Sequence, residues 1–433
     1  MAFCADVKEH DARLTEKDIL CLGHLKRVFS LLDALHEAGC DRDRAGNRRL
    51  FFDGYVKLVL LYTWNPLIES VHDLQQAAGL PKVAKALGVK RFSAGSFSES
   101  VRLFDPEQLK PIIAELAGQL TPGPKDPRLA ELKHALTLVD GTVLTALTRL
   151  ARAAVGAEAR YGTTRDGRAA CGWRLHTQLD LQTFFPHRID RTGARNAGDT
   201  RENNVLRRTL EAGRCYVDDG GYADRTLFDD IHAIGSSYVT RVREDSVLDV
   251  AEERLLSDAA LAAGVVRDAV VTLGGADATP MNHPVRIVQV QVEPHPRRTR
   301  KAPGGVQKGT RQTDLVAIAT DLLELEAELV ALIYQYRYTV ELFFRVLKQL
   351  LGLRHLISQR EEGIDVQVYC ALIVCLLIQL ISGSKPNKAM RNMVGWHLLG
   401  LATEQDVIDF LNRPDNTGIK KRAKDELWKK LGY

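Results

Sequence analysis

The chain has 433 residues, of which 45% are hydrophobic and 26% are charged, and its formal net charge is +4. This length exceeds one ordinary domain and predicts two to four units, and the composition is typical of a globular protein. The weak positive charge is compatible with a nucleic-acid partner but does not by itself indicate one.

Cysteine usage and apolar runs narrow the class of protein further. The chain has seven cysteines and no C-x2-C pair, which predicts neither a zinc site nor a disulfide framework and indicates a reducing cytosol. Residues 1–18 are polar and acidic, so no signal peptide is expected. The apolar run at 366–381 is shorter than the ~20 residues that a bilayer requires. A buried core helix is the preferred interpretation of this run.

Residues 17–120 predict a small helical domain with sharp turns and no strands. Ser96 and Glu99 match a capping box that would open one helix, and Asp105 followed by Pro106 predicts the start of the next. A packing domain and a helix-turn-helix DNA-binding domain explain this pattern equally well. The proline-rich segment 121–127 then predicts a linker.

Beyond the linker, strands and helices mix, which predicts an α/β fold. Core strands are expected at 135–139, 173–181, 184–189, 215–217 and 237–242, and strands of an inserted unit at 265–273 and 285–292. A basic loop follows at 295–311, and a helical pattern resumes near residue 321. Residues 418–431 predict a basic amphipathic helix.

Four polar residues follow one face of the helix expected around residue 340: Tyr334, Arg337, Glu341 and Lys348. Their steps of three, four and seven residues correspond to about one, one and two helical turns. Because the flanking positions are apolar, the helix is predicted to be buried and to carry a carboxylate among cations. An ordinary helix ion pair between Arg337 and Glu341 is the alternative interpretation.

Further acids follow two short apolar strands, namely Asp140 and the adjacent pair Asp218 and Asp219. Carboxylates at strand ends gather in the cleft at a sheet edge, where they repel one another unless a divalent cation neutralises them. Oxygen ligands favour Mg²⁺ or Mn²⁺, and a pair of such ions supports phosphodiester transfer. Each acid alone is more often a turn residue, so only their combination indicates a metal site.

In these positions the chain resembles the DDE transposases of bacterial insertion sequences, in the group with a Y-x2-R-x3-E-x6-K signature. The matching residues are Tyr334, Arg337, Glu341 and Lys348. Residues 138–142 (LVDGT) are similar to the first-acid motif of this group. Residues 219–222 (DGGY) are similar to its D-x-G-Y motif, which favours Asp219 over Asp218 as the second acid. The resemblance covers roughly residues 90–383.

The resemblance implies a ribonuclease-H-like core with a β-rich insertion, preceded by a helical N-terminal domain. The implied division is 1–125 for the DNA-binding helical domain, 126–242 for the first part of the core, 243–315 for the insertion, 316–385 for the second part of the core, and 386–433 for a helical tail that dimerises or contacts DNA. The implied reaction is cut-and-paste transposition, in which transposon ends are nicked and their 3′-hydroxyl groups are joined to target DNA.

The resemblance also implies roles for the residues of the signature. Asp140, Asp219 and Glu341 would hold two Mg²⁺ or Mn²⁺ ions. Phosphates near the transposon end would be bound by Tyr334, Arg337 and Lys348. The implied partners are terminal inverted repeats, target DNA and a second copy of the chain, with no membrane, in the cytoplasm at the nucleoid.

Other residues are weighed against plainer interpretations. Four basic residues of the loop, Arg297, Arg298, Arg300 and Lys301, are expected to contact duplex DNA rather than only solvent. His176 is expected to be a structural strand histidine rather than a catalytic one, and Glu202 a solvent-facing helical residue rather than one that supports the catalytic acids. Relatives that flip a base carry a tryptophan in the insertion, whereas residues 241–333 contain no Phe, Trp or Tyr, so a hairpin step is only weakly indicated.

Two other functions remain open from the sequence. One is a nuclease of the same fold that does not transfer strands. The other is a DNA-binding protein derived from a transposase, against which the intact acids argue.

Overall fold

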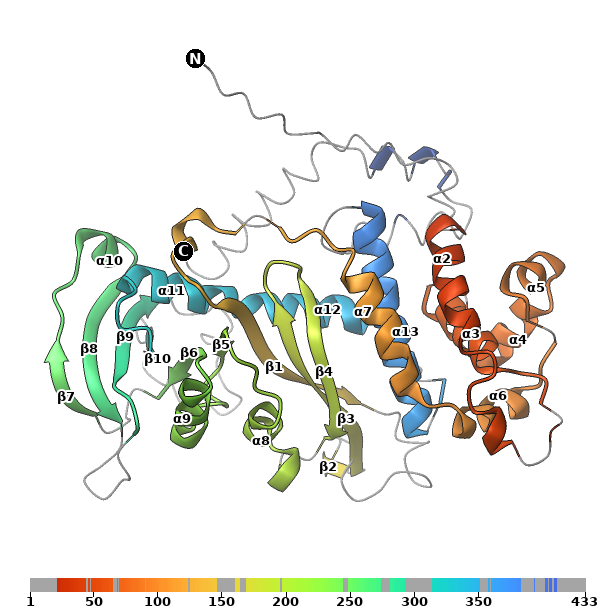
Figure 1. Ribbon diagram of the computed structural model, residues 1–433, viewed down its shortest axis with the longest axis horizontal. Coiled ribbons are helices and arrows are strands. Elements are labelled where there is room, and N and C mark those ends of the chain that lie inside the picture. The colour runs from red at the N-terminus through yellow and green to blue at the C-terminus, as the bar shows by residue number, and fades with distance from the viewer. Residues whose placement is uncertain are drawn as a thin grey trace, which may run out of the picture. The chain divides into compact units, whose positions relative to one another are not determined.

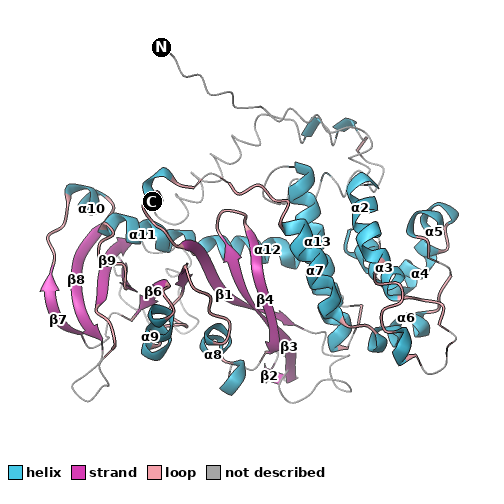
Figure 2. Ribbon diagram, in the orientation of Figure 1, coloured by secondary structure: helices cyan, strands magenta, loops and turns pink. Residues whose placement is uncertain are grey.

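The computed structural model divides the chain into two compact units, which are described separately (Figures 1 and 2). One unit contains Met1–Leu120 and Leu350–Lys420, and the other contains Thr121–Gln349 and Lys421–Tyr433. The structure describes residues 22–145 (without 44–45, 47, 65–67, 69, 90 and 124), 160–163, 169–243 (without 195–196), 248–273, 281–292, 314–350, 357–382 (without 359), and a few positions between 393 and 410.

The first unit is helical, and its described residues form no strand. Its elements are α2 (Leu22–Asp33), η1 (Cys40–Arg42), α3 (Phe52–Trp64), α4 (Val71–Ala78), α5 (Pro81–Leu87), α6 (Ala94–Ser100), η2 (Val101–Leu103), η3 (Pro106–Leu109), α7 (Lys110–Ala117) and α13 (Glu361–Ser382). Its aromatic core includes Phe52 stacked on Phe104, with ring centroids 4.6 Å apart, and Tyr55 stacked on Phe97 at 4.4 Å. This unit matches the predicted helical character of the N-terminal region.

One of the two predicted helix starts is confirmed and the other is wrong. The Asp105 carboxylate accepts a hydrogen bond from the Glu107 backbone N–H and caps η3 at Pro106. The predicted capping box at Ser96 does not open a helix, because α6 already begins at Ala94. The Ser93 hydroxyl caps this helix by accepting a hydrogen bond from the Ser96 N–H at 3.0 Å. Both serines satisfy the composition rule for a cap, and only the backbone decides between them.

The long helix α13 packs with the N-terminal helices α3 and α7. The predicted division assigned residues 316–385 to the catalytic core, and the structure differs from it in the last part of that range. By length and composition Glu361–Leu380 could cross a membrane, but 89% of its most apolar window is buried inside the structure. A helix that is apolar on all sides requires a partner on all sides, which the helical unit provides.

The second unit contains a ten-stranded sheet flanked by helices. Its strands are β1 (Ala135–Thr145), β2 (Arg160–Thr163), β3 (Ala169–Asp180), β4 (Phe185–Gly193), β5 (Arg214–Asp218), β6 (Ser237–Val242), β7 (Leu248–Glu253), β8 (Val265–Leu273), β9 (Val285–Val292) and β10 (Asp314–Thr320). Its helices are η4 (Pro127–Leu129), η6 (Gly198–Thr200), α8 (Glu202–Arg207), α9 (Arg225–Ala233), α10 (Asp258–Ala262), α11 (Ala327–Tyr336) and α12 (Tyr338–Leu350).

Five strands of this sheet form a ribonuclease-H-like core. β3 pairs with both β1 and β4 in antiparallel fashion, and β5 lies parallel to β1 and to β6. The spatial order is therefore β4-β3-β1-β5-β6, with the first three strands antiparallel and the last two parallel to β1. This order confirms the predicted fold class.

The β-rich insertion continues the core sheet. β10 pairs with β6, and β9, β8 and β7 follow in antiparallel order. The bounds predicted for β8 and β9 agree with the structure, because both strands are rich in valine and isoleucine. β10 was not predicted, and the helix expected from about residue 321 begins at Ala327.

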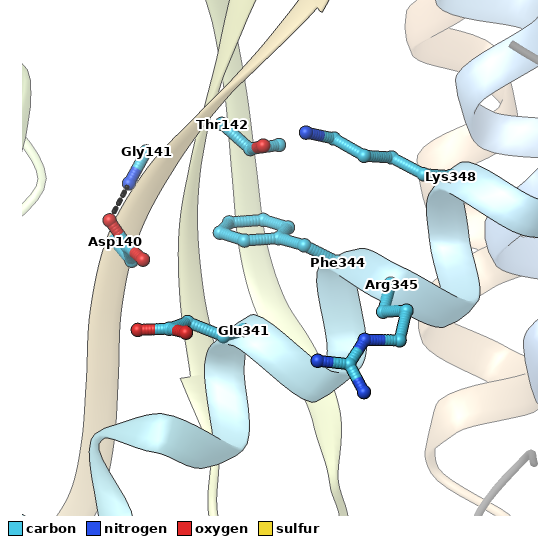
Figure 3. Close-up of a pocket in the computed structure, with 7 residues that line it drawn as sticks. All are labelled: Asp140, Gly141, Thr142, Glu341, Phe344, Arg345 and Lys348. Carbon is cyan, nitrogen blue, oxygen red and sulfur yellow. Dashed lines mark hydrogen bonds between the residues drawn. The ribbon is translucent and has the colours of Figure 1, made fainter. Parts of the chain in front are cut away.

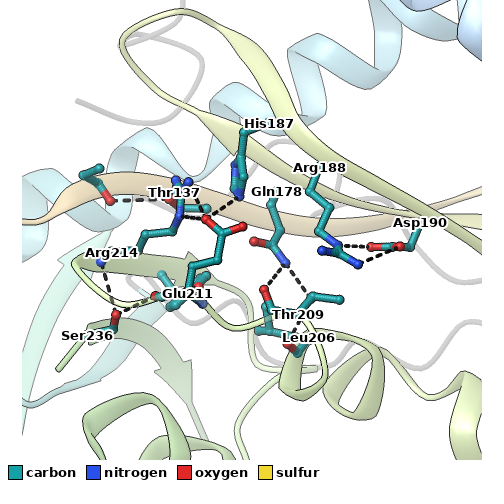
Figure 4. Close-up of polar contacts among 12 residues, drawn as sticks. Thr137, Gln178, His187, Arg188, Asp190, Leu206, Thr209, Glu211, Arg214 and Ser236 are labelled. Carbon is teal, nitrogen blue, oxygen red and sulfur yellow. Dashed lines mark hydrogen bonds and ion pairs between the residues drawn. The ribbon is translucent and has the colours of Figure 1, made fainter. Parts of the chain in front are cut away.

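A polar network holds the start of β5 against β1 (Figure 4). The Arg214 guanidinium donates to Glu211 Oε2 at 2.7 Å and to Thr137 Oγ1 at 3.2 Å, while the Arg214 backbone N–H donates to Ser236 Oγ at 3.1 Å. Ser236 in turn donates to the Glu211 carbonyl. These bonds fix the register in which Ala135 pairs with Arg214. The alignment of β1 and β5 is therefore set before the two strands reach Asp140 and Asp219.

Candidate active site

A pocket of about 470 Å³ lies between β1 and α12 (Figure 3). It is lined by Asp140, Gly141, Thr142, Glu341, Phe344, Arg345 and Lys348. Two predicted acids and one predicted phosphate-binding residue, separated by some 200 residues of sequence, therefore share one pocket. Figure 3 shows the carboxylates of Asp140 and Glu341 directed toward the same space.

Asp140 lies in the middle of β1, opposite Thr177 of β3. One of its carboxylate oxygens accepts a hydrogen bond from the Gly141 backbone N–H at 2.7 Å. Burial raises the pKa of Asp140 to about 6, the Gly141 N–H and Arg337 oppose the rise, and the charges of Asp219 and Glu341 add to it. The strand therefore holds a carboxyl group whose ionised form is only partly compensated by its neighbours.

Asp219 follows β5 at the level of Asp140. The parallel register pairs Leu138 with Val217, and two further residues along each strand lead to Asp140 and Asp219. Asp219 Oδ1 accepts a hydrogen bond from the Gly221 N–H at 2.8 Å, and a Cβ atom at Gly221 would stand only 2.9 Å from that oxygen. The second glycine of DGGY thus leaves room for the Asp219 carboxylate.

Asp218 lies on the other face of the sheet, because successive side chains along a strand point to opposite faces. Its side chain is fully buried, and neither carboxyl oxygen has a hydrogen-bond partner among the described residues. Burial raises the pKa of Asp218 well above its ordinary value. Burial and its place on the face opposite Asp140 make Asp218 a poorer candidate than Asp219 for the second acid.

The helix predicted to carry the four signature residues is two helices. α11 ends at Tyr336, α12 begins at Tyr338, and Arg337 lies between them. Around this junction the Arg337 N–H bonds to the Tyr334 carbonyl and the Val340 N–H bonds to the Arg337 carbonyl, both of which span three residues. The tighter turn separates Tyr334 on α11 from Glu341 and Lys348 on α12.

Arg337 forms the ion pair with Glu341 that the spacing allowed, with Nη2 2.7 Å from Oε1. The pair also contributes to the pocket, because Glu341 lines it and the charge of Arg337 lowers the pKa of Asp140. The ion-pair interpretation is therefore confirmed, and a role of the same residues in a catalytic site stays a prediction.

The other two signature residues lie on either side of this pair. Burial raises the pKa of Tyr334, and the charges that act on it come from Arg337, Arg241, Asp219 and Asp218. Tyr334 therefore lies near the second acid. Burial lowers the pKa of Lys348, partly opposed by the charge of Asp140, so Lys348 lies near the first acid.

The donor set fits a divalent cation. Asp140 and Glu341 supply carboxylate oxygens to one pocket, and repulsion between neighbouring acids is relieved by a hard cation. Within the described ranges, no three Asp, Glu, His or Cys side chains form a ready-made metal-binding group. Glu341 is instead engaged by Arg337.

Several predictions outside the pocket have different outcomes. Arg297, Arg298, Arg300 and Lys301 lie outside the described residues, so the structure does not test them. His176 has the structural role expected of it, because its Nε2 pairs with Thr192 Oγ1 at 2.8 Å and burial lowers its pKa to about 4.

The prediction that Glu202 faces solvent is wrong. Its side chain is only 14% exposed and forms an ion pair with Arg174 at 2.5 Å. No sequence signal links Glu202 to Arg174, because one lies on α8 and the other on β3. Arg345 was also missed, although its position four residues after Glu341 places it on the same helical face and could have identified it.

Comparisons with known proteins point to one family. The family model described as Transposase DDE domain matches residues 131–377, more than half of the chain. A protein of Sinorhizobium fredii (strain NBRC 101917 / NGR234) named "Putative transposase y4zB" is 24% identical over 224 residues, which cover 48% of this chain and 56% of that protein. The chain thus spans about half the length of the curated relative that it matches.

A solved structure is also similar to the chain as a whole. It is the piggyBac transposase synaptic complex with hairpin DNA, which matches with a TM-score of 0.43 at 12% identity over 98% of this chain and 87% of that one. The family model, whose range includes Asp140, Asp219 and Glu341, is the finding that identifies the family. By this match, the chain belongs to the transposase DDE domain family.

Proposed function

We propose that the chain is a metal-dependent DNA transposase that nicks the ends of a mobile element and joins the 3′-hydroxyl ends to target DNA. The observation that carries the proposal is the pocket in which Asp140 and Glu341 meet Arg345 and Lys348. Carboxylates that hold metal ions and cations that bind phosphates together suit the metal-dependent cutting of a phosphodiester bond.

In this proposal Asp140, Asp219 and Glu341 hold two Mg²⁺ or Mn²⁺ ions. Bound ions would supply activation of the attacking hydroxyl and stabilisation of the leaving oxygen. Arg337 orients the Glu341 carboxylate through their 2.7 Å contact. The register of β1 and β5 puts Asp140 and Asp219 at one level, and Glu341 lines the same pocket as Asp140.

The DNA is held by cations around the acids. Lys348 and Arg345 line the pocket, and Tyr334 and Arg337 lie beside it, where phosphates of the transposon end would approach. The loop residues Arg297, Arg298, Arg300 and Lys301 are proposed as further phosphate contacts. Two copies of the chain would pair two DNA ends, in the cytoplasm at the nucleoid.

The direct test uses the purified full-length chain, a labelled fragment carrying the inverted repeats that flank its reading frame, and a target plasmid in Mg²⁺. We expect cleaved ends followed by labelled ends joined to the plasmid. Cleavage without joining would instead indicate a nuclease of the same fold. Binding without cleavage would indicate a DNA-binding protein derived from a transposase.

The two neighbouring acids at the end of β5, Asp218 and Asp219, should respond differently to substitution. Asp219→Asn is expected to abolish cleavage because it removes a carboxylate at the level of Asp140. Asp218→Asn is expected to retain it, because this fully buried side chain faces away from Asp140 and is replaced by an amide of the same shape. The rate of end cleavage by each variant checks this. If Asp218→Asn alone lost activity, the second catalytic acid would be Asp218, on the opposite face of the sheet.

Removing the Lys348 charge should weaken binding of transposon ends. Lys348→Gln is expected to lower affinity about threefold to tenfold and to reduce the slope of log affinity against log salt by about one phosphate's worth. Fluorescence anisotropy over a salt series measures both quantities. Arg267→Gln is the matched control, because Glu253 already neutralises Arg267 at 2.5 Å. An equal slope in Lys348→Gln and wild type would contradict the phosphate contact.

A further inference from the structure

The hydroxyl of Tyr336 joins two segments that lie 210 residues apart in the chain. It donates a hydrogen bond to Asp126 Oδ2 at 2.7 Å. Tyr336 is the last residue of α11, and Asp126 is the N-cap of η4, which precedes β1. The bond therefore connects the end of a helix with the entrance to the strand that carries Asp140.

The acceptor of this bond is held in place by Arg128. The Arg128 guanidinium donates to both carboxylate oxygens of Asp126, at 3.0 and 2.7 Å, and its backbone N–H donates to Oδ1 at 3.0 Å. The bond from Arg128 holds the pKa of Asp126 below its ordinary value. Burial raises the pKa of Tyr336 to about 12, and the bond to Asp126 adds to the rise. A protonated hydroxyl thus faces an ionised carboxylate, and the hydrogen bond is charge-assisted.

The segment between Asp126 and β1 is fixed as well. Lys125 Nζ donates a hydrogen bond to the Leu132 carbonyl, which closes the segment on itself. The side chains of Leu129 and Leu132 are buried. This segment is therefore a fixed support for the hydroxyl of Tyr336.

The residue after the tyrosine, Arg337, forms the junction between α11 and α12. Its guanidinium contacts Glu341 at 2.7 Å, and the charges of Arg337 and Glu341 both act on Asp140. The rest of α12 has a separate support, because Phe343 packs edge-on against Phe184 with ring centroids 6.2 Å apart. Loss of the tyrosine hydroxyl should therefore loosen the junction without unfolding α12.

We propose that Tyr336 is a positioning residue, which anchors the helix junction to the entrance of β1 through Asp126 and so holds Glu341 in the pocket with Asp140. This inference rests on the proposed function, in which Asp140 and Glu341 are metal-binding acids. A directional bond at the helix end limits the movement of the acid one turn further on. A displacement of about 1 Å in a reacting group can slow a reaction about a hundredfold.

Tyr336→Phe removes the hydroxyl and keeps the ring. At saturating end DNA and Mg²⁺ we expect the cleavage rate constant to fall about fivefold to thirtyfold, with the affinity for end DNA unchanged. Asp126→Leu, which also loses the cap of η4, should be at least as slow, and adding Tyr336→Phe to it should cause no further loss. Asp126→Asn should stay near wild type, because its amide oxygen can accept the bond and asparagine also caps helices.

A second measurement requires neither metal nor DNA. Hydrogen–deuterium exchange of the full-length protein follows the Arg337 and Val340 amides, which bond to the Tyr334 and Arg337 carbonyls. We expect both amides to exchange faster in Tyr336→Phe than in wild type.

Tyr238→Phe is the matched control, because it removes a buried tyrosine hydroxyl that bonds to His283 Nε2 at 3.0 Å instead. It should lower the melting temperature while exchange at the junction and the cleavage rate stay at wild-type values. All rates are measured well below the lowest melting temperature of the set, so that loss of folded protein does not contribute.

Slower cleavage by Tyr336→Phe, with unchanged end affinity and faster exchange at the junction, would support the inference. Cleavage at the rate of Tyr238→Phe would overturn it, as would slower cleavage without faster exchange, since the hydroxyl would then act by another route. Asp140→Asn separates this result from the proposed function. If Asp140→Asn cleaves like wild type, the proposed site itself fails; if it is inactive while Tyr336→Phe cleaves normally, only the positioning role fails.

Discussion

Glu341→Gln is expected to lower the rate of Mg²⁺-dependent end cleavage by about a thousandfold or more while DNA-end binding persists. The substitution keeps the size of the side chain and its ability to accept a hydrogen bond from Arg337, so the fold of α12 should be retained. It removes one negative charge from a pocket where Asp140 is the other acid. A gel assay of labelled ends, with binding measured separately, checks the two halves of this result.

The matched control for Glu341→Gln is Glu253→Gln, which makes the same chemical change at an exposed ion pair on β7. It should cleave like wild type. Cleavage by Glu341→Gln at a rate near wild type would remove Glu341 from the site and, with it, the interpretation of the signature. Loss of binding together with cleavage would indicate instead that the glutamate supports the structure of the DNA-binding surface.

Breaking the buried ion pair between Arg286 and Asp268 in the insertion is expected to cause a large loss of stability of the sheet unit. Arg286 is only 2% exposed, and its guanidinium donates to both carboxylate oxygens of Asp268, at 2.8 and 2.7 Å. It also donates to the Leu322, Leu323 and Leu325 carbonyls in the connection that leads into α11. Arg286→Met should therefore lower the free energy of unfolding of the sheet unit by about 3–5 kcal/mol.

This loss should be measured by unfolding in urea. Hydrogen–deuterium exchange of β8 and β9 should show that the sheet unit is the one that unfolds. The double variant Arg286→Met/Asp268→Leu should recover much of the loss, because no unpaired charge is left buried. Arg267→Gln should cost about 1 kcal/mol or less, since its pair with Glu253 is exposed. A cost for Arg286→Met no larger than that of the control would contradict a desolvated charge at this position.

Strands of the sheet, in the core and in the insertion, could be predicted where a valine-rich or isoleucine-rich run is bounded by polar turns. β6, β8 and β9 begin and end where expected. β1 continues six residues beyond the predicted run, through Asp140 to Thr145, because its pairing with β3 compensates the polar residues. Composition alone therefore ends the strand too early where a neighbouring strand pairs with the backbone of polar residues.

The helical elements were harder to assign to a unit. α13 has almost no polar face and fits a core of either unit by composition, and only the packing against α3 and α7 assigns it to the helical one. The junction at Arg337 was also not predictable, since the residues from Tyr334 to Lys348 keep a helical spacing across it. One tighter turn at Arg337 ends the first helix and begins the second while the spacing of the polar residues stays intact.

For the site, the sequence by itself determined the identity and the spacing of the acids and cations, because a helical period and two strand-end motifs are local properties. Only the tertiary structure decided which of them share a pocket, that Asp219 rather than Asp218 lies at the level of Asp140, and that Glu202 packs on Gly141. These relations depend on strand register and on contacts between distant segments. The free energy that selects them comes from burial across the whole sheet, which no short stretch of sequence contains.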